Sequence, residues 1–127
     1  MFSFKGGYQY PTNNQDFRWF LGNAGDSCDT TCSNLLLINA AAAAMSLITT
    51  GDCNMIDHFR TSLSLSYTQN TYTAYWTFGY FYTNYQTYYC TSYGTLDAAV
   101  NVGHTNIYST RRLVCPCSGI IKALYTI

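Results

Sequence analysis

Residues 25–32 read GDSCDTTC and residues 111–117 read RRLVCPC, and these two stretches decide the fold. They supply four of the six cysteines, and Cys53 and Cys90 lie between them. Six cysteines in 127 residues are typical of a protein that folds in an oxidising compartment, so we expect disulfides at all six. The sequence leaves their pairing open. A bridge from the first stretch to the last would close a loop worth about 4–5 kcal/mol of chain entropy.

A zinc site is the alternative use of these cysteines. Cys28, Cys32, Cys115 and Cys117 could together supply four thiolates. Their spacings, C-x3-C and C-x-C, differ from the C-x2-C spacing of common zinc knuckles. We therefore predict disulfides, with no metal and no cofactor.

The charge of the chain narrows its range of partners. Six basic and six acidic residues give a net charge of zero, and there is no Glu. Such a chain lacks the basic surface that nucleic acids and anionic membranes require. A net charge near zero also favours self-association. The length predicts one domain over residues 1–127.

A long helix is predicted to follow the first cysteine stretch. Asp26 or Ser27 is a suitable N-cap, and Asp29 suits the first turn. In such a helix Cys28 and Cys32 lie on one face. The apolar run over 35–48 extends the predicted helix to about residue 48 and indicates that it is buried. A membrane span is the rival interpretation, but this run is too short for one.

The remainder of the chain predicts one short helix and a sheet. Residues 52–60 suggest a helix that buries Met55, Ile56 and Phe59. Residues 71–83 alternate between aromatic and mostly threonine positions, as a half-buried antiparallel strand does, and 85–93 suit a return strand. The fold class is therefore α+β: a disulfide-stapled single domain with one long buried helix packed on a mainly antiparallel sheet or sandwich.

No pattern in the sequence predicts catalysis. His58 and His104 beside Arg111, Arg112 and Lys122 could suggest a pair of imidazoles near cations, but no spacing supports it. The chain has no paired carboxylates arranged for glycoside hydrolysis and no Gly-x-Ser-x-Gly motif. We expect a protein that is not an enzyme.

Both ends of the chain predict self-assembly. Residues 1–11 read as an extended aromatic arm, and an arm of this kind can add as a strand to a neighbour's sheet. Contacts that do not close on themselves build filaments, so we expect a homo-oligomer or polymer. The alternative is a monomer whose terminal strands pair within its own sheet. The predicted interface residues are Phe2, Phe4, Tyr8, Tyr10, Ile120, Ile121, Leu124 and Ile127.

Carbohydrate binding is the second functional hypothesis. Thirteen Tyr and two Trp offer flat rings on which sugars could stack. The candidate outward-facing rings are Trp19, Tyr75 and Phe81. The aromatic face of residues 71–83 is more simply interpreted as part of the hydrophobic core. The threonines on the other face suit an ordinary solvent-facing strand, with O-glycosylation as one alternative. There is no Asn-x-Ser/Thr sequon for N-glycosylation.

The cysteine frame and its flanking residues resemble a small cysteine-rich module of cell-surface and extracellular proteins of algae and other microbial eukaryotes, including filamentous or mastigoneme-like ones. The residues that carry the resemblance are Trp19-Phe20-Leu21-Gly22, Gly25, Ser27-Cys28-Asp29, Cys32, Cys53-Asn54, Arg111-Arg112-Leu113 and Cys115-Pro116-Cys117. The resemblance implies an extracellular location and a structural or recognition role. It implies no catalytic residues.

Overall fold

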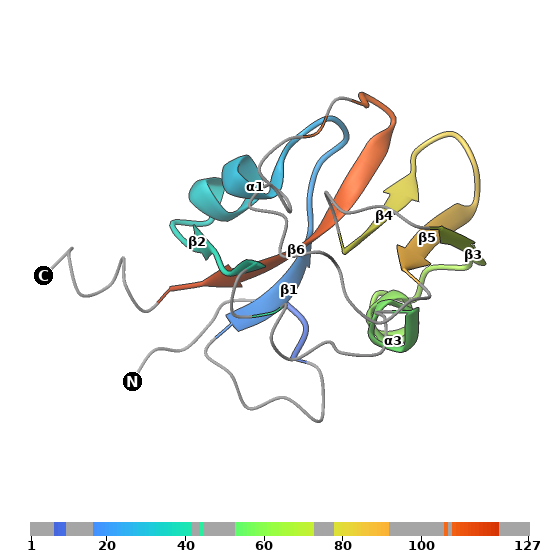
Figure 1. Ribbon diagram of the computed structural model, residues 1–127, viewed down its shortest axis with the longest axis horizontal. Helices are drawn as coiled ribbons and strands as arrows, with labels where there is room; N and C mark the ends of the chain where they lie inside the picture. Colours follow the sequence, from blue (N-terminus) through green and yellow to red (C-terminus); the bar gives the residue numbers. More distant parts are fainter. Residues whose placement is uncertain are drawn as a thin grey trace, which may run out of the picture.

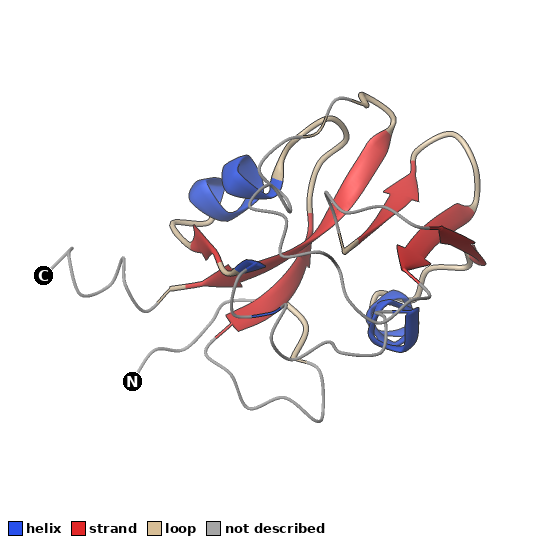
Figure 2. Cartoon of the chain, viewed as in Figure 1, coloured by secondary structure: helices blue, strands red, loops and turns tan. Residues whose placement is uncertain are grey.

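The structure, a computed structural model, describes residues 7–9, 17–41, 44, 53–72, 78–91, 106 and 108–119. Its helices and strands confirm the predicted α+β class with a mainly antiparallel sheet (Figures 1 and 2). In chain order they are β1 (Phe17–Leu21), α1 (Cys28–Asn34), β2 (Ile38–Asn39), α3 (Cys53–Ser62), β3 (Thr68–Tyr72), β4 (Gly79–Tyr82), β5 (Thr87–Thr91) and β6 (Arg111–Ser118).

The strand order of the sheet is β1-β6-β4-β5-β3, and β6 also pairs with β2, so it has three partner strands. One edge of β6 pairs antiparallel with β1. Its other edge pairs antiparallel with β2 near Ser118 and with β4 near Arg111. Strand β5 pairs antiparallel with β4 on one side and parallel with β3 on the other. The predicted single strand over 71–83 is therefore wrong, because β3 and β4 lie on opposite sides of β5.

Pro116 lies inside β6, where proline is unusual because it lacks an N–H. Its carbonyl accepts a hydrogen bond from the Ala40 N–H at 2.9 Å, on the β2 side of β6. The N–H and C=O of one residue in an antiparallel strand point to the same side. The missing N–H would therefore face the Ala40 carbonyl, which instead accepts a hydrogen bond from the Ala44 N–H at 3.0 Å.

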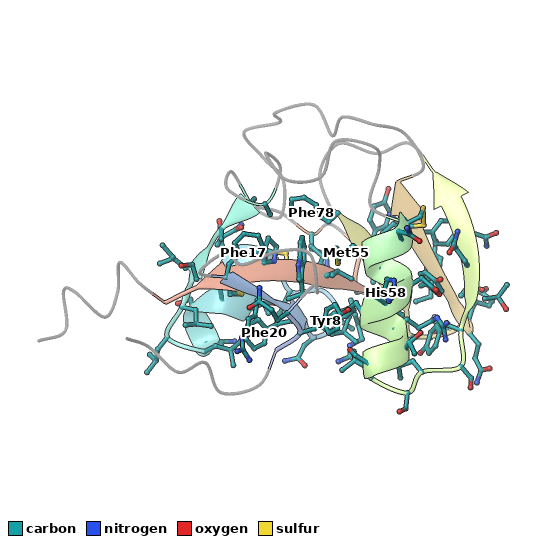
Figure 3. All side chains as sticks on the ribbon, turned by 90° about the horizontal axis from the view of Figure 1, so that it is seen from below. Tyr8, Phe17, Phe20, Met55, His58 and Phe78 are labelled. Atoms are coloured by element: carbon teal, nitrogen blue, oxygen red, sulfur yellow. A yellow bond between two sulfur atoms is a disulfide. The ribbon has the colours of Figure 1, made fainter. Side chains whose placement is uncertain are left out.

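The two faces of the sheet are covered differently, since successive side chains of a strand point to opposite faces. Leu113, Cys115 and Cys117 face α1. Val114 faces the larger core, which includes Phe17, Trp19 and the buried side of α3. Figure 3 shows Phe17, Met55 and Phe78 gathered between the sheet and α3. The sheet is thus the middle layer between two helices.

Helix α3 forms where a second helix was predicted. Met55, Ile56 and Phe59 are all buried, as expected from their i, i+1, i+4 spacing. Arg60 in the last turn donates through Nη1 to the Leu65 carbonyl at 2.8 Å, which ties the helix end to the following loop. This part of the sequence-based prediction is confirmed.

Helix α1 begins as predicted and ends far earlier. The Ser27 side chain accepts a hydrogen bond from the Thr30 N–H at 3.1 Å and caps the first turn. At the other end, the Leu36 N–H bonds to the Ser33 carbonyl and the Leu37 N–H to the Cys32 carbonyl, at 2.9 and 2.8 Å. These two bonds form a Schellman motif, which terminates a helix.

The prediction of one helix from 28 to 48 is therefore wrong. The chain leaves α1 at Asn34 and enters β2 at Ile38. It is helical again at Ala41 and Ala44, which are buried, while residues 45–52 lie outside the described part of the chain. An apolar run predicted a buried helix, but backbone hydrogen bonds at residues 32–37 stopped it.

Leu36 occupies the position of the Schellman motif where glycine is usual. Its φ of +61° is left-handed, and its side chain is 79% exposed. Left-handed backbone costs a residue with a Cβ about 1–2 kcal/mol, and glycine avoids that cost. We expect Leu36→Gly to raise the free energy of unfolding by about 0.5–1 kcal/mol after the added chain entropy. Urea titration measures this change.

Leu35→Gly is the matched control for that variant. Leu35 has a φ of −93°, so a glycine there relieves no left-handed backbone. It should lower stability by about 0.5–1 kcal/mol, because only the entropy cost remains. Equal losses in both variants would show that the Leu36 conformation carries no strain.

Candidate functional site

All six cysteines form disulfides, which confirms the prediction and leaves no thiolate for zinc. The bonds are Cys28–Cys115, Cys32–Cys117 and Cys53–Cys90. The first two join α1 to β6 as parallel rungs. Four helical residues advance by about 6 Å, and two strand residues by about 6.6–6.8 Å. A C-x3-C helix and a C-x-C strand therefore match in spacing and can be joined twice.

Beyond α1, the same face of the sheet carries a cluster of tyrosines, which we call the tyrosine face. It lies where β4, β5 and the start of β6 meet, and α1 covers the opposite end of that face. Its strand members alternate with core residues along β4 and β5, which places their side chains on one face, and two further members lie on the adjoining turns. They are Tyr80, Tyr82, Tyr85, Tyr89 and Tyr108, arranged around Arg111.

Arg111 lies between the rings of this face. Its guanidinium carbon is 3.6 Å from the ring centroid of Tyr108 and 4.3 Å from that of Tyr80. Its Nη2 also donates to the Tyr82 hydroxyl at 3.3 Å. Contacts of a cation with ring faces are each worth about 0.5–2 kcal/mol. They hold the arginine in place and orient the tyrosines beside it.

The solvent exposure of the rings increases from one end of the tyrosine face to the other. Tyr80 is buried and stacks on Tyr89 with ring centroids 5.0 Å apart. Burial raises the pKa of Tyr80 well above its usual value, and the positive charge of Arg111 opposes that rise. Tyr85 and Tyr108, on two neighbouring turns, are 66% and 41% exposed. The Thr83 N–H joins these turns by bonding to the Thr110 carbonyl at 2.9 Å.

The predicted sugar-stacking residues do not form this surface. Trp19 and Phe81 are each 1% exposed, so the prediction that their rings face outward is wrong. Trp19 packs edge-on against Phe78, and Phe81 stacks on Tyr88. Tyr75 lies outside the described residues. The sequence signal for the tyrosine face was the alternation along β4, which places Tyr80 and Tyr82 on the side opposite Phe81.

Among the predicted assembly residues, the structure describes Tyr8. Its backbone exchanges two hydrogen bonds of 2.8 Å with Trp19 of the edge strand β1, and its ring lies edge-on to Phe59 at 6.1 Å. This part of the arm therefore pairs within its own chain. The other residues of the predicted interface, Phe2, Phe4, Tyr10, Ile120, Ile121, Leu124 and Ile127, lie outside the described part.

Of the residues considered for catalysis, those that the structure describes are not brought together. His58 is exposed on α3, which covers the face of the sheet opposite Arg111. Arg112 donates to the Gly22 carbonyl at 2.8 Å, and His104 and Lys122 lie outside the described residues. Within the residues described, no three His, Cys or acidic side chains are grouped as a metal site requires. Neither helix there is long and apolar enough to cross a membrane.

A polar network ties α3 to β5. Asp57 accepts from Arg60 Nε at 3.1 Å and Nη2 at 2.9 Å, and from the Tyr88 hydroxyl at 3.0 Å. The hydrogen bonds from Arg60 lower the pKa of Asp57, burial opposes this, and the Tyr88 hydroxyl lowers it further. Burial raises the pKa of Tyr88, and its bond to Asp57 adds to that rise.

This network predicts a dependence of stability on acidic pH. The folded-state pKa of Asp57 lies below its unfolded value, so its contribution is present above about pH 4 and lost as the pH falls below that. Because the Asp57 side chain is half exposed, we expect about 0.2–1 kcal/mol, as for other surface ion pairs. Asp57→Asn should flatten the acid limb of unfolding free energy against pH. An unchanged slope would contradict this account.

Comparison with known proteins adds no relative: no family model, no curated protein and no solved structure matches this chain. Its class therefore follows from its own geometry, which is that of a disulfide-stapled, aromatic-rich α+β domain. Three disulfides within the chain are compatible with an extracellular protein.

Proposed function

We propose that this chain is a structural subunit of an extracellular assembly, either a filament or a cell-surface coat, with a role that is not catalytic. The observation that carries the proposal is the tyrosine face, which presents the exposed rings of Tyr85 and Tyr108 on two turns next to β4 and β6. Two disulfides fix β6 to α1. Tyrosine gives large contact areas at low entropy cost, and it is enriched at protein interfaces.

Two further properties support assembly. The net charge of zero removes the long-range repulsion that keeps many proteins monomeric. The terminal segments outside residues 7–9 are proposed to add contacts between copies, while Tyr8 itself pairs with Trp19 of its own chain. The resemblance of the cysteine frame to modules of microbial surface proteins agrees with this role and with an extracellular location.

Sedimentation and negative-stain microscopy over a range of concentrations test the proposal. We expect large particles from the intact chain and smaller ones after removal of residues 1–6. This truncation retains Gly7 and Tyr8, so the contact of Tyr8 with Phe59 is preserved. Tyr85→Ser should also reduce particle size. A monomer at every concentration would refute assembly.

Carbohydrate binding is the second candidate, favoured by one observation: Tyr85 and Tyr108 are exposed on turns that are hydrogen-bonded to each other. Two such rings could stack on neighbouring sugar units. This function predicts a monomer that is retained on an insoluble polysaccharide. Tyr85→Ala or Tyr108→Ala should abolish retention, whereas Leu63→Ala, at another exposed apolar residue, should not.

A further inference from the structure

Four tyrosine rings form a continuous series from the interior to the surface. Tyr80 and Tyr89 are stacked with centroids 5.0 Å apart, Tyr82 contacts Tyr89 at 5.4 Å, and Tyr85 contacts Tyr82 at 5.7 Å. Tyr85 ends the series at the turn between β4 and β5. It is the most exposed tyrosine among those whose side chains the structure describes.

We propose that Tyr85 is a site of oxidative coupling, at which two copies of the chain become joined through a carbon–carbon bond between their tyrosine rings. The inference rests on the proposed assembly, which brings copies together. The oxidant is hydrogen peroxide used by a haem peroxidase. Each phenol loses one electron and one proton, two phenoxyl radicals join at ring carbons beside the hydroxyl, and both rings regain aromaticity. Two tyrosines and one peroxide thus give one dityrosine and two waters.

The ring series favours Tyr85 over its neighbours. A phenol must release its proton to become a phenoxyl radical, and Tyr80 is disfavoured because burial raises its pKa. If an inner tyrosine is oxidised first, an electron can pass to it from Tyr85 through the contacting rings. This transfer leaves the radical on Tyr85. Coupling then requires that two rings meet, and only an exposed ring permits this.

The cysteines of the chain do not interfere with this reaction. Thiols reduce phenoxyl radicals, but all six cysteines are in disulfides.

Tyr108 is also exposed, but the Arg111 guanidinium lies 3.6 Å from its ring centroid. A positive charge over the ring opposes loss of an electron and covers one face. Tyr108 is therefore a matched control: an exposed tyrosine that should couple poorly.

The test treats the purified full chain with a haem peroxidase and hydrogen peroxide. Reducing denaturing gels should show a covalent dimer, and mass spectrometry should place the link at residue 85. Tyr85→Phe removes only a hydroxyl from an exposed ring and should lose most of the dimer, while Tyr108→Phe should keep it. Three results would overturn the inference. They are no dimer from the unmodified chain, as much dimer from Tyr85→Phe as from the unmodified chain, or crosslinks only at residues other than 85.

The same samples separate this inference from the proposed function. Particles that form without peroxide support assembly whether or not Tyr85 couples. If Tyr85→Phe forms particles and still crosslinks, the coupling site is wrong and assembly stands. If the unmodified chain sediments as a monomer but couples at Tyr85 through collisions, the site stands and assembly is wrong.

Discussion

Removing both disulfides between α1 and β6 is expected to cost about 7 kcal/mol, whereas removing either one alone should cost about 2–3 kcal/mol. The reason is that the two bonds close almost the same loop, with sequence separations of 87 and 85 residues. With one bond intact, the other closes only a small ring of about 8 residues, worth about 2.5 kcal/mol. The loop across most of the chain, worth about 4–5 kcal/mol, opens only when both are gone.

The measurement is a double-mutant cycle on unfolding free energies. Cys28→Ala with Cys115→Ala removes the first bond, and Cys32→Ala with Cys117→Ala removes the second. The quadruple variant should lose about 2 kcal/mol more than the sum of the two pairs. Small domains have a total stability of about 5–15 kcal/mol, so this variant should be measured in a sucrose series that favours the folded state.

The third disulfide provides the control. Cys53–Cys90 joins α3 to β5, away from the two parallel rungs. Combining its removal with that of Cys28–Cys115 should give additive losses within about 0.5 kcal/mol, because Cys32–Cys117 still closes the long loop. Additive losses between the two rungs would contradict the shared-loop explanation.

Phe81→Ala is expected to lower the unfolding free energy by about 3–5 kcal/mol. Phe81 is 1% exposed, stacks on Tyr88 at 5.2 Å and meets Tyr67 edge-on at 5.2 Å. Truncating it removes a ring from the centre of the larger core and leaves a cavity next to Phe59. Urea titration followed by circular dichroism measures the loss.

Tyr85→Ala is the matched comparison for Phe81, because both are aromatic residues near the end of the β4–β5 hairpin. Since Tyr85 is 66% exposed, its truncation should change stability by about 0.5 kcal/mol or less. If Tyr85→Ala proved as costly as Phe81→Ala, the placement of these two rings would be wrong.

The cysteine frame made much of the fold predictable. Disulfides at all six positions followed from composition, and the start of α1 followed from the capping preference of Ser27 and the charge of Asp29. Helix α3 followed from the spacing of its apolar residues. Each of these features depends on residues close together in the chain or on the chemistry of one residue type.

The errors arose where distant contacts outweighed local preference. The apolar residues after Asn34 favour a long helix, yet the Schellman motif ends α1 and the pairing of β2 with β6 holds the following residues extended. The side of β4 that carries Phe81 faces the larger core, whereas Tyr80 and Tyr82 lie on the side of Arg111, so the prediction that Phe81 faces outward was wrong. Trp19 was misjudged for the same reason, since α3 and Phe78 cover it.

The candidate site was only partly predictable. The abundance of tyrosine pointed to aromatic contacts, but the sequence could not place Tyr108 and Arg111 beside Tyr80 and Tyr82. These residues are separated by some 30 positions along the chain and meet because β6 pairs with β4. The choice between assembly and sugar binding depends on the partner that the tyrosine face contacts, which the residue pattern does not encode.

The position of β6 in the chain order also affects biosynthesis. The strand that joins β1, β2 and β4, and that carries two of the cysteine partners, follows all of them in the sequence. A polypeptide emerging from the ribosome or a translocation channel cannot complete this sheet until residue 118 has emerged. Until then, the aromatic segments that β6 will cover remain accessible, and Cys28 and Cys32 lack their native partners. Completion of this sheet and of the two native disulfides that join β6 to α1 should therefore wait until β6 has emerged.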